Sequence, residues 1–159
     1  MAALRRGLSG FAGATAVALL LVGIVSLAVA MNGGGTEPLL LLYPGIAAFG
    51  ARRVHPGWLV VVAATLAPPL ALAVHLFTYP LSLGRGTLAE AQATSFPPNA
   101  FFVAGVAVAT AAAIGVSATF MRRAGLGWQI AGFAAGFLTW GVAYFVAAIA
   151  QGVLWPPTT

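Results

Sequence analysis

Few side chains in this sequence are suited to chemistry, and they lie far apart along the chain. The 159 residues include two His, two Glu and seven Arg, but no Cys, Asp or Lys. A chain without cysteine can form no disulfide, thiolate nucleophile or thiolate-bound metal centre. The sequence also lacks G-x-S-x-G, H-E-x-x-H, a P-loop and a dinucleotide-binding fingerprint. The residue types therefore favour a protein that is not an enzyme.

His75 is the ionisable residue placed deepest in an apolar segment. Such a group is costly inside a membrane, and it could serve as a haem ligand, a metal ligand or a proton-handling group. A neutral imidazole bonded to a backbone carbonyl or to interfacial water is the simpler interpretation. His55 cannot complete a bis-histidine haem in one chain, because a helix joining the two would be about 30 Å long. His75 stays a candidate cofactor-binding residue, and no cofactor is predicted.

Two carboxylates complete the small set of chemically active groups. Glu37 and Glu90 fall on the same predicted side of the membrane as His75, and together they could bind a divalent metal or share a proton. Their spacing matches no known ligand pattern. A solvated Glu37 at a helix start and a loose pair between Glu90 and Arg85 are favoured instead. No metal site is predicted.

The composition is that of an integral membrane protein. Hydrophobic residues make up 61% of the chain and charged residues 6%, whereas soluble proteins carry about 25% charged residues. A surface this apolar must face lipid. The net charge of +5 does not indicate nucleic-acid binding, because the arginines occur as isolated pairs between apolar segments. The predicted fold is an all-α, single-domain bundle of transmembrane helices.

Five apolar segments are predicted to cross the bilayer, which takes about 20 residues for one helix. They span 8–31, 38–51, 57–79, 99–121 and 127–154, with an outer loop over 80–98. The second reaches only about 21 Å and contains Pro44-Gly45, so it is either a short crossing or a re-entrant segment. Ala28-Val29-Ala30 resembles a signal-peptidase site, although a retained first helix is favoured. Cleavage, or a re-entrant second segment, would leave four spans.

Arginine pairs set the predicted orientation. With five crossings and a cytoplasmic N-terminus, six of the seven arginines fall inside, as the positive-inside bias requires. These six are Arg5, Arg6, Arg52, Arg53, Arg122 and Arg123. Arg85 alone falls outside. We therefore expect a multi-pass protein of the cell membrane, with its C-terminus outside.

Small residues recur at four-residue spacing in the last two segments, where they can let helices approach closely. The predicted packing residues are Gly105, Ala109, Ala113, Gly115, Gly132 and Gly136. Such spacing also arises by chance in a chain rich in Ala and Gly, and it more often packs helices within one chain. Pro68-Pro69 predicts a kink or hinge in the third segment, and Pro97-Pro98 an extended corner before the fourth.

Three functional hypotheses follow. The favoured one is a non-catalytic accessory or structural subunit, which contacts lipid and binds other membrane chains or itself through small-residue faces. It rests on the lack of a recognisable site and on the minimal soluble part. The second is a small oligomeric transporter or channel, suggested by the segments broken at Pro44 and Pro68. The third is a membrane redox or enzyme subunit that uses His75.

Overall fold

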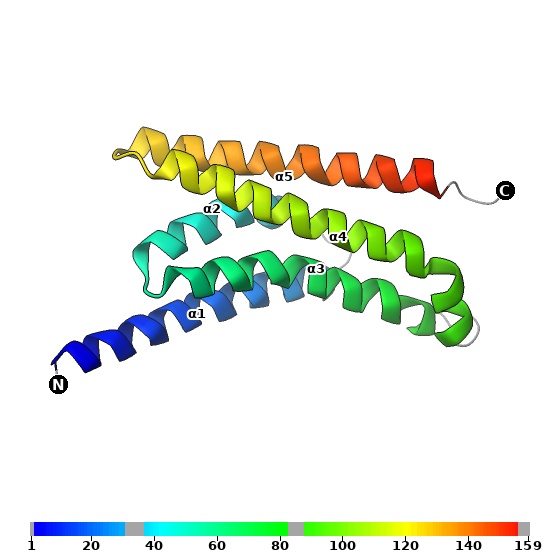
Figure 1. Ribbon diagram of the computed structural model, residues 1–159, viewed down its shortest axis with the longest axis horizontal. Coiled ribbons are helices and arrows are strands. Elements are labelled where there is room, and N and C mark those ends of the chain that lie inside the picture. Colours follow the sequence, from blue (N-terminus) through cyan, green and yellow to red (C-terminus); the bar gives the residue numbers. More distant parts are fainter. Residues whose placement is uncertain (1, 31–36, 83–87, 156–159) are drawn as a thin grey trace.

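The computed structural model describes residues 2–30, 37–82 and 88–155, and the regular secondary structure in these ranges is entirely helical. The five helices are α1 (Ala2–Ala30), α2 (Glu37–Arg53), α3 (Gly57–Ser82), α4 (Leu88–Met121) and α5 (Leu126–Leu154). Successive helices run in opposite directions along one long axis (Figure 1). The predicted all-α helical bundle is therefore confirmed.

Three of the helices are long and apolar enough to cross a membrane. The qualifying stretches are Gly57–Leu76 in α3, Pro97–Met121 in α4 and Leu126–Leu154 in α5. The described apolar part of α1 is the shorter stretch Gly10–Ser26, and α2 has only 17 residues. A transmembrane helical protein is thus supported, whereas the crossings by α1 and α2 remain a prediction.

α2 is the central helix of the bundle, because it contacts each of the other four. From Tyr43 to Ala48 every residue is buried except the half-buried Ile46. Gly45 lies against the ring of Phe133 on α5, so closely that an added methyl group would overlap it. Since protein covers the middle of this helix, that part does not need the long apolar sequence of a lipid-facing span. This position explains why 38–51 gives such an ambiguous sequence signal.

Prolines lie inside α2, α3 and α4. α3 continues through the buried residues Pro68 and Pro69, and whether they act as a hinge stays a prediction. The extended corner predicted at Pro97-Pro98 is wrong, because both residues lie inside α4. A proline removes one backbone donor and displaces the preceding turn, which bends a helix without necessarily ending it. The first turns of α4 accordingly run in a different direction from the rest (Figure 1).

The core is built from small and medium-sized apolar side chains where α1, α2 and α3 meet. Its members include Ala14, Leu21, Tyr43, Ala47, Val60 and Ala64, all at most 1% exposed. Large apolar side chains point outward instead, especially on α5, where Phe145 is 68% exposed. Bulky apolar groups outside and small ones inside are what a bundle surrounded by lipid requires.

Candidate functional site

The most extensive helix contact in the described structure joins α4 to α5. Gly132 and Gly136 on α5 face Ser117 and Met121 on α4. A Cβ atom on Gly132 would lie 2.6 Å from Cγ of Met121, and one on Gly136 would overlap the Ser117 hydroxyl. That hydroxyl donates a hydrogen bond of 2.9 Å to the carbonyl oxygen of Gly132. The glycine pair thus brings the two helices into close contact within one chain.

The small residues of α4 continue this packing. Gly105 faces Ala147 on α5, whose Cβ would lie 2.8 Å from a Cβ added to the glycine. Ala109 and Ala113 follow on the same side of α4, and both are buried. The carbonyl oxygen of Ala113 would lie 3.4 Å from a Cβ on Gly136. This row of α4 therefore serves packing inside the chain.

Hydrogen bonds fix the register of the same two helices. Trp140 on α5 donates from Nε1 to the buried Thr110 hydroxyl at 3.2 Å, and that hydroxyl donates in turn to the Val106 carbonyl at 2.7 Å. Nearer the other end, Gln151 Nε2 donates to the Pro98 carbonyl at 3.1 Å. Each bond satisfies a polar group that lipid could not, so together they hold the hairpin in one arrangement.

Gly115, the remaining predicted packing residue, lies on the opposite side of α4. It is exposed, and no atom lies within 4 Å of the position that its Cβ would take. We define the outer face of α4 as four exposed small residues, Ala111, Ala112, Gly115 and Thr119, with the exposed Val108 and Phe120 at its two ends. Most exposed positions of α5 carry bulky side chains instead, among them Leu138, Val142, Phe145, Val146, Ile149 and Val153. The outer surfaces of these two helices therefore differ in kind.

One end of the bundle collects positive charge. The N-terminus of α1, the C-terminus of α2 and the turn between α4 and α5 all lie there (Figure 1). Arg52 and Arg53 form the last turn of α2, and Arg122 and Arg123 lie in the α4–α5 turn. Gly10 of α1 lies beside the His55 carbonyl, so the α1 residues before it extend past the α2–α3 turn. The side chains of Arg5 and Arg6 lie outside the described part.

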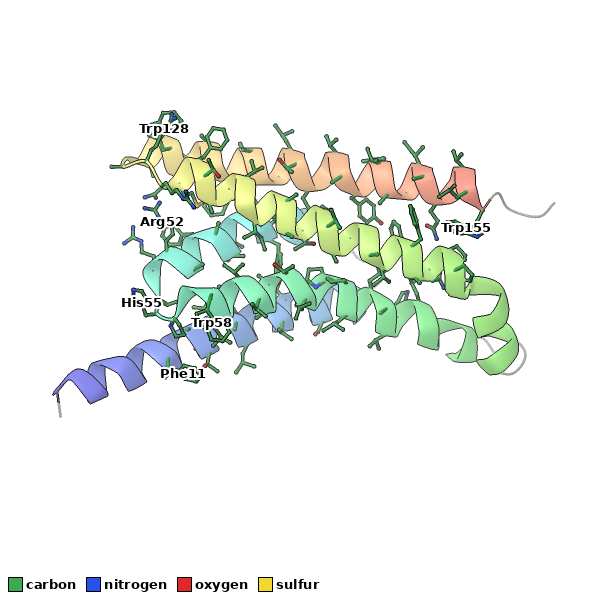
Figure 2. The ribbon with its side chains drawn as sticks, viewed as in Figure 1. Phe11, Arg52, His55, Trp58, Trp128 and Trp155 are labelled. Atoms are coloured by element: carbon green, nitrogen blue, oxygen red, sulfur yellow. The ribbon has the colours of Figure 1, made fainter. Side chains whose placement is uncertain are left out.

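Aromatic residues mark both ends of the apolar region. Trp58 and Trp128 lie at the arginine end, and Trp155 lies at the other (Figure 2). Two arginines pack on aromatic rings: Cζ of Arg53 is 5.0 Å from the centre of the Phe49 ring, and Cζ of Arg123 is 4.2 Å from that of Trp128. Each exposed contact of this type contributes about 0.5–1 kcal/mol. Cations and amphipathic rings thus lie at one level, an arrangement typical of residues at a membrane interface.

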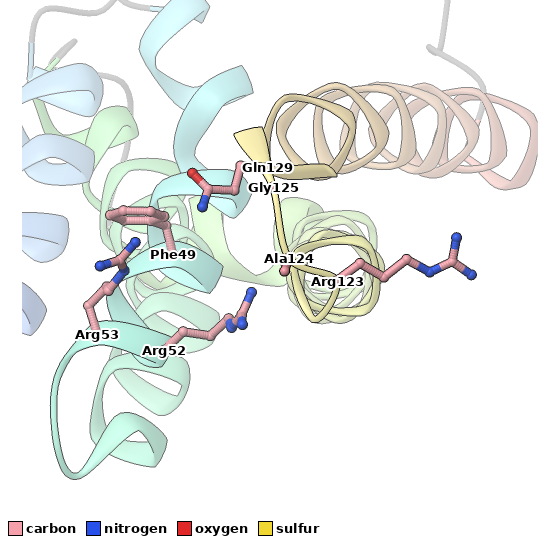
Figure 3. Close-up of a pocket in the computed structure, with 7 residues that line it drawn as sticks. All are labelled: Phe49, Arg52, Arg53, Arg123, Ala124, Gly125 and Gln129. Carbon is pink, nitrogen blue, oxygen red and sulfur yellow. The ribbon is translucent and has the colours of Figure 1, made fainter. Parts of the chain in front are cut away.

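A cavity of about 270 Å³ opens at this end, between the last turn of α2 and the α4–α5 turn. Its lining comes from Phe49, Arg52 and Arg53 on α2, from Ala124 and Gly125 in the turn, and from Gln129 on α5. Arg52 reaches across the cavity toward Ala124, and Gln129 points toward Phe49 (Figure 3). Arg123 also contributes to the lining, but its guanidinium group points away.

Tyr43 holds a polar group of a different kind. Its ring is 1% exposed at the centre of the bundle, and its hydroxyl has no hydrogen-bond partner among the described residues. Pro44, the next residue, lacks a backbone donor, which leaves the carbonyl one turn earlier without its helical bond. An unpartnered buried hydroxyl costs about 1–3 kcal/mol. The presence of this buried hydroxyl therefore calls for a structural or functional explanation.

Of the residues considered for cofactor or metal chemistry at the outer end, the structure describes the side chain of His75 alone. His75 is half-buried on α3, and the described residues contain no group of three or more His, Cys, Asp or Glu that could hold a metal ion. The side chains of Glu37, Arg85 and Glu90 lie outside the described part. Sequence reasoning missed the arginine-lined cavity and the Tyr43 hydroxyl. The signal for the cavity was the presence of two arginine pairs, each at the turn of a predicted hairpin. The signal for the hydroxyl was a tyrosine within the apolar segment Leu39–Ala48.

Comparison of this chain with protein-family models, with curated proteins and with solved structures gives no match.

Proposed function

We propose that this protein is a non-enzymatic subunit of a membrane complex, which binds another membrane chain or a second copy of itself through the outer face of α4. The observation that carries the proposal is the contrast between two exposed surfaces. Around Gly115 the surface of α4 is made of small residues, whereas α5 exposes bulky ones such as Phe145 and Ile149.

The contrast has a physical basis. Lipid chains solvate a bulky apolar side chain as well as another helix does, so lipid-facing positions gain nothing from being small. Small residues let two backbones approach and gain dispersion contacts that lipid cannot match. Within this chain the row at Gly132 and Gly136 is used in that way against α4. The outer face of α4 offers the same surface to a helix from outside the chain.

The proposal includes location and orientation. The protein lies in the cell membrane with its arginine end on the cytoplasmic side, crosses five times, and has its C-terminus outside. The gathering of the α1 start, the α2 end and the α4–α5 turn at one end supports this orientation, because cytoplasmic loops carry the excess of Arg. Trp155 at the opposite end supports a second interface there.

Orientation is tested with single cysteines in this cysteine-free chain. Ala124→Cys in the α4–α5 turn should react with a membrane-impermeant maleimide only from the cytoplasmic side. Trp155→Cys beyond α5 should react only from outside. Labelling of both from one side would refute the orientation and the crossing by α5.

Association is tested by oxidative cross-linking in native membranes followed by mass spectrometry. Gly115→Cys should form a specific cross-linked species with a partner chain or a second copy, and Ile149→Cys on the bulky surface of α5 serves as the control. Gly115→Leu should abolish co-purification of that partner in mild detergent, whereas Val142→Leu should not. A monomer that gives no more cross-linking at Gly115→Cys than at Ile149→Cys would overturn the proposal.

A small transporter or channel is the second candidate, and the Tyr43 hydroxyl is the observation that favours it. A buried polar group beside Pro44 is the kind of feature that binds a permeant ion or a small polar solute in a broken helix. In liposomes, Tyr43→Phe should then reduce the flux of that solute without reducing stability. Equal flux through the wild type, the variant and empty liposomes would dispose of this candidate.

A further inference from the structure

The cavity at the arginine end lies between two helix ends that both present positive charge. Arg52 and Arg53 close α2 on one side, and on the other side lies the N-terminal end of α5, preceded by a turn whose Arg123 guanidinium points away from the cavity. No acidic side chain lies in the first turn of α5, and Gly125 before it provides no side-chain cap. The positive end of the α5 dipole therefore adds to the arginines, with no carboxylate beside it.

No carboxylate of the described helices can neutralise this charge. Glu37 begins α2, and about 24 Å of helix separates it from Arg53. Glu90 lies near the start of α4, more than about 30 Å of helix from Met121 at its end. Both separations exceed the screening length of about 10 Å at moderate salt. The counter-charge for the cavity must come from outside the chain.

We propose that this cavity binds the phosphate group of an anionic phospholipid. Arg52 reaches across the cavity with a planar guanidinium group that can donate paired hydrogen bonds to phosphate oxygens, and Gln129 adds an amide donor from α5. Arg53, which packs on the Phe49 ring, adds a second positive charge beside the cavity. The volume of about 270 Å³ lies just below the range of small-molecule pockets, roughly 300–1,000 Å³. It suits a compact head group better than an extended organic substrate.

The position of the cavity selects a lipid over a dissolved phosphate. It lies at the same end of the apolar bundle as Trp58 and Trp128, the level at which head groups meet a spanning helix (Figure 2). Phe49, which is 37% exposed, lines the cavity on its α2 side and can contact the upper part of an acyl chain. Basic pockets between helices on the cytoplasmic side are a recurrent way of holding anionic head groups.

The test is native mass spectrometry of the full-length protein in mild detergent, titrated with phosphatidylglycerol or phosphatidylcholine. We expect phosphatidylglycerol to bind at least about tenfold more tightly. Arg52→Gln should weaken its binding about tenfold, the effect of losing one charge-assisted hydrogen bond. Arg122→Gln is the matched control, because it removes the same charge from the same end without touching the lining of the cavity. It should change the affinity by less than about threefold.

Two further measurements separate loss of the guanidinium geometry from loss of charge, and a lipid site from a site for a soluble anion. Arg52→Lys retains the charge and loses the planar fork, so it should fold normally and still weaken binding measurably. Inorganic phosphate added to the lipid-bound protein should not displace the lipid. Equal losses in Arg52→Gln and Arg122→Gln would show only diffuse attraction and overturn the proposal. Displacement by inorganic phosphate would overturn it in favour of a site for a soluble anion.

Discussion

The contact at Gly136 gives the sharpest prediction about what holds this bundle together. A Cβ atom there would overlap Oγ of Ser117 and lie 3.3 Å from Cβ of the same residue. Gly136→Ala therefore forces the hydroxyl to rotate, and its 2.9 Å hydrogen bond to the Gly132 carbonyl is lost. The lost bond costs about 1 kcal/mol and the overpacking about 1–3 kcal/mol. The better helix propensity of alanine returns about 1 kcal/mol. We expect a net destabilisation of about 1–3 kcal/mol.

Gly141→Ala on the same helix is the matched control, because a Cβ atom added at Gly141 would contact no neighbouring side chain or helix within 4 Å. It should leave stability unchanged or raise it by up to about 1 kcal/mol. The free energy of unfolding is measured in mixed micelles of mild detergent and SDS, with tryptophan fluorescence as the signal. Equal stabilities for Gly136→Ala and Gly141→Ala would refute the packing argument.

A double-mutant cycle tests whether the Ser117 hydroxyl causes the destabilisation expected of Gly136→Ala. Ser117→Ala alone should cost about 0.5–1.5 kcal/mol, since it removes one buried hydrogen bond. It also removes the oxygen that the new methyl group of Gly136→Ala would strike. The double variant should therefore be no less stable than Ser117→Ala alone, with a coupling of at least about 1 kcal/mol. Additive costs would mean that the backbone of α4, and not the Ser117 hydroxyl, limits the approach.

The remaining predictions use the same unfolding assay. Trp140→Phe should destabilise by about 1–3 kcal/mol, because it removes the hydrogen bond to Thr110 and part of a buried indole ring; an unchanged stability would mean that this bond is not formed. Tyr43→Phe should leave stability unchanged or raise it by up to about 2 kcal/mol, because the deleted hydroxyl has no partner in the described structure. A loss of stability above about 1 kcal/mol would reveal a bound water or ligand. Gly45→Ala should destabilise more than Gly136→Ala, because its methyl group would strike the ring of Phe133 rather than a hydroxyl that can rotate.

The low charged fraction of 6% predicted an apolar surface, and the apolar segments of about 20 residues predicted helices, so the helical class could be predicted from the sequence. The helix 126–154 was equally predictable, since its sequence is one long apolar run followed by Pro156 and Pro157. The course of the chain at Pro97 and Pro98 was not. A local rule makes a proline pair a helix end, but the tertiary structure decides whether the helix bends or stops there.

The candidate sites were harder to predict from the sequence than the fold. The arginine pairs were evident as topology signals, but the cavity needs the end of α2 and the start of α5 beside each other, a contact between positions more than 70 residues apart. The burial of the Tyr43 hydroxyl without a partner in the described part of the chain could not be predicted for a similar reason. Whether a tyrosine points into the core or toward the lipid interface depends on which helices surround it, and in this bundle α2 contacts all four other helices and buries Tyr43 among them.

The two small-residue rows of α4 show what helix geometry alone decides and what it leaves to packing. Gly105 and Ala113 lie on one row and Gly115 on the other. The rows are offset by two residues, which is about 200° around a helix, so they lie on opposite sides. Once one row packs against α5, the other must face away from it. The outer side of α5 exposes mainly bulky side chains such as Phe145, whereas the row at Gly115 exposes small ones. Small residues allow the backbone of a second helix to approach closely, and this difference is why we propose that the row at Gly115 meets another protein.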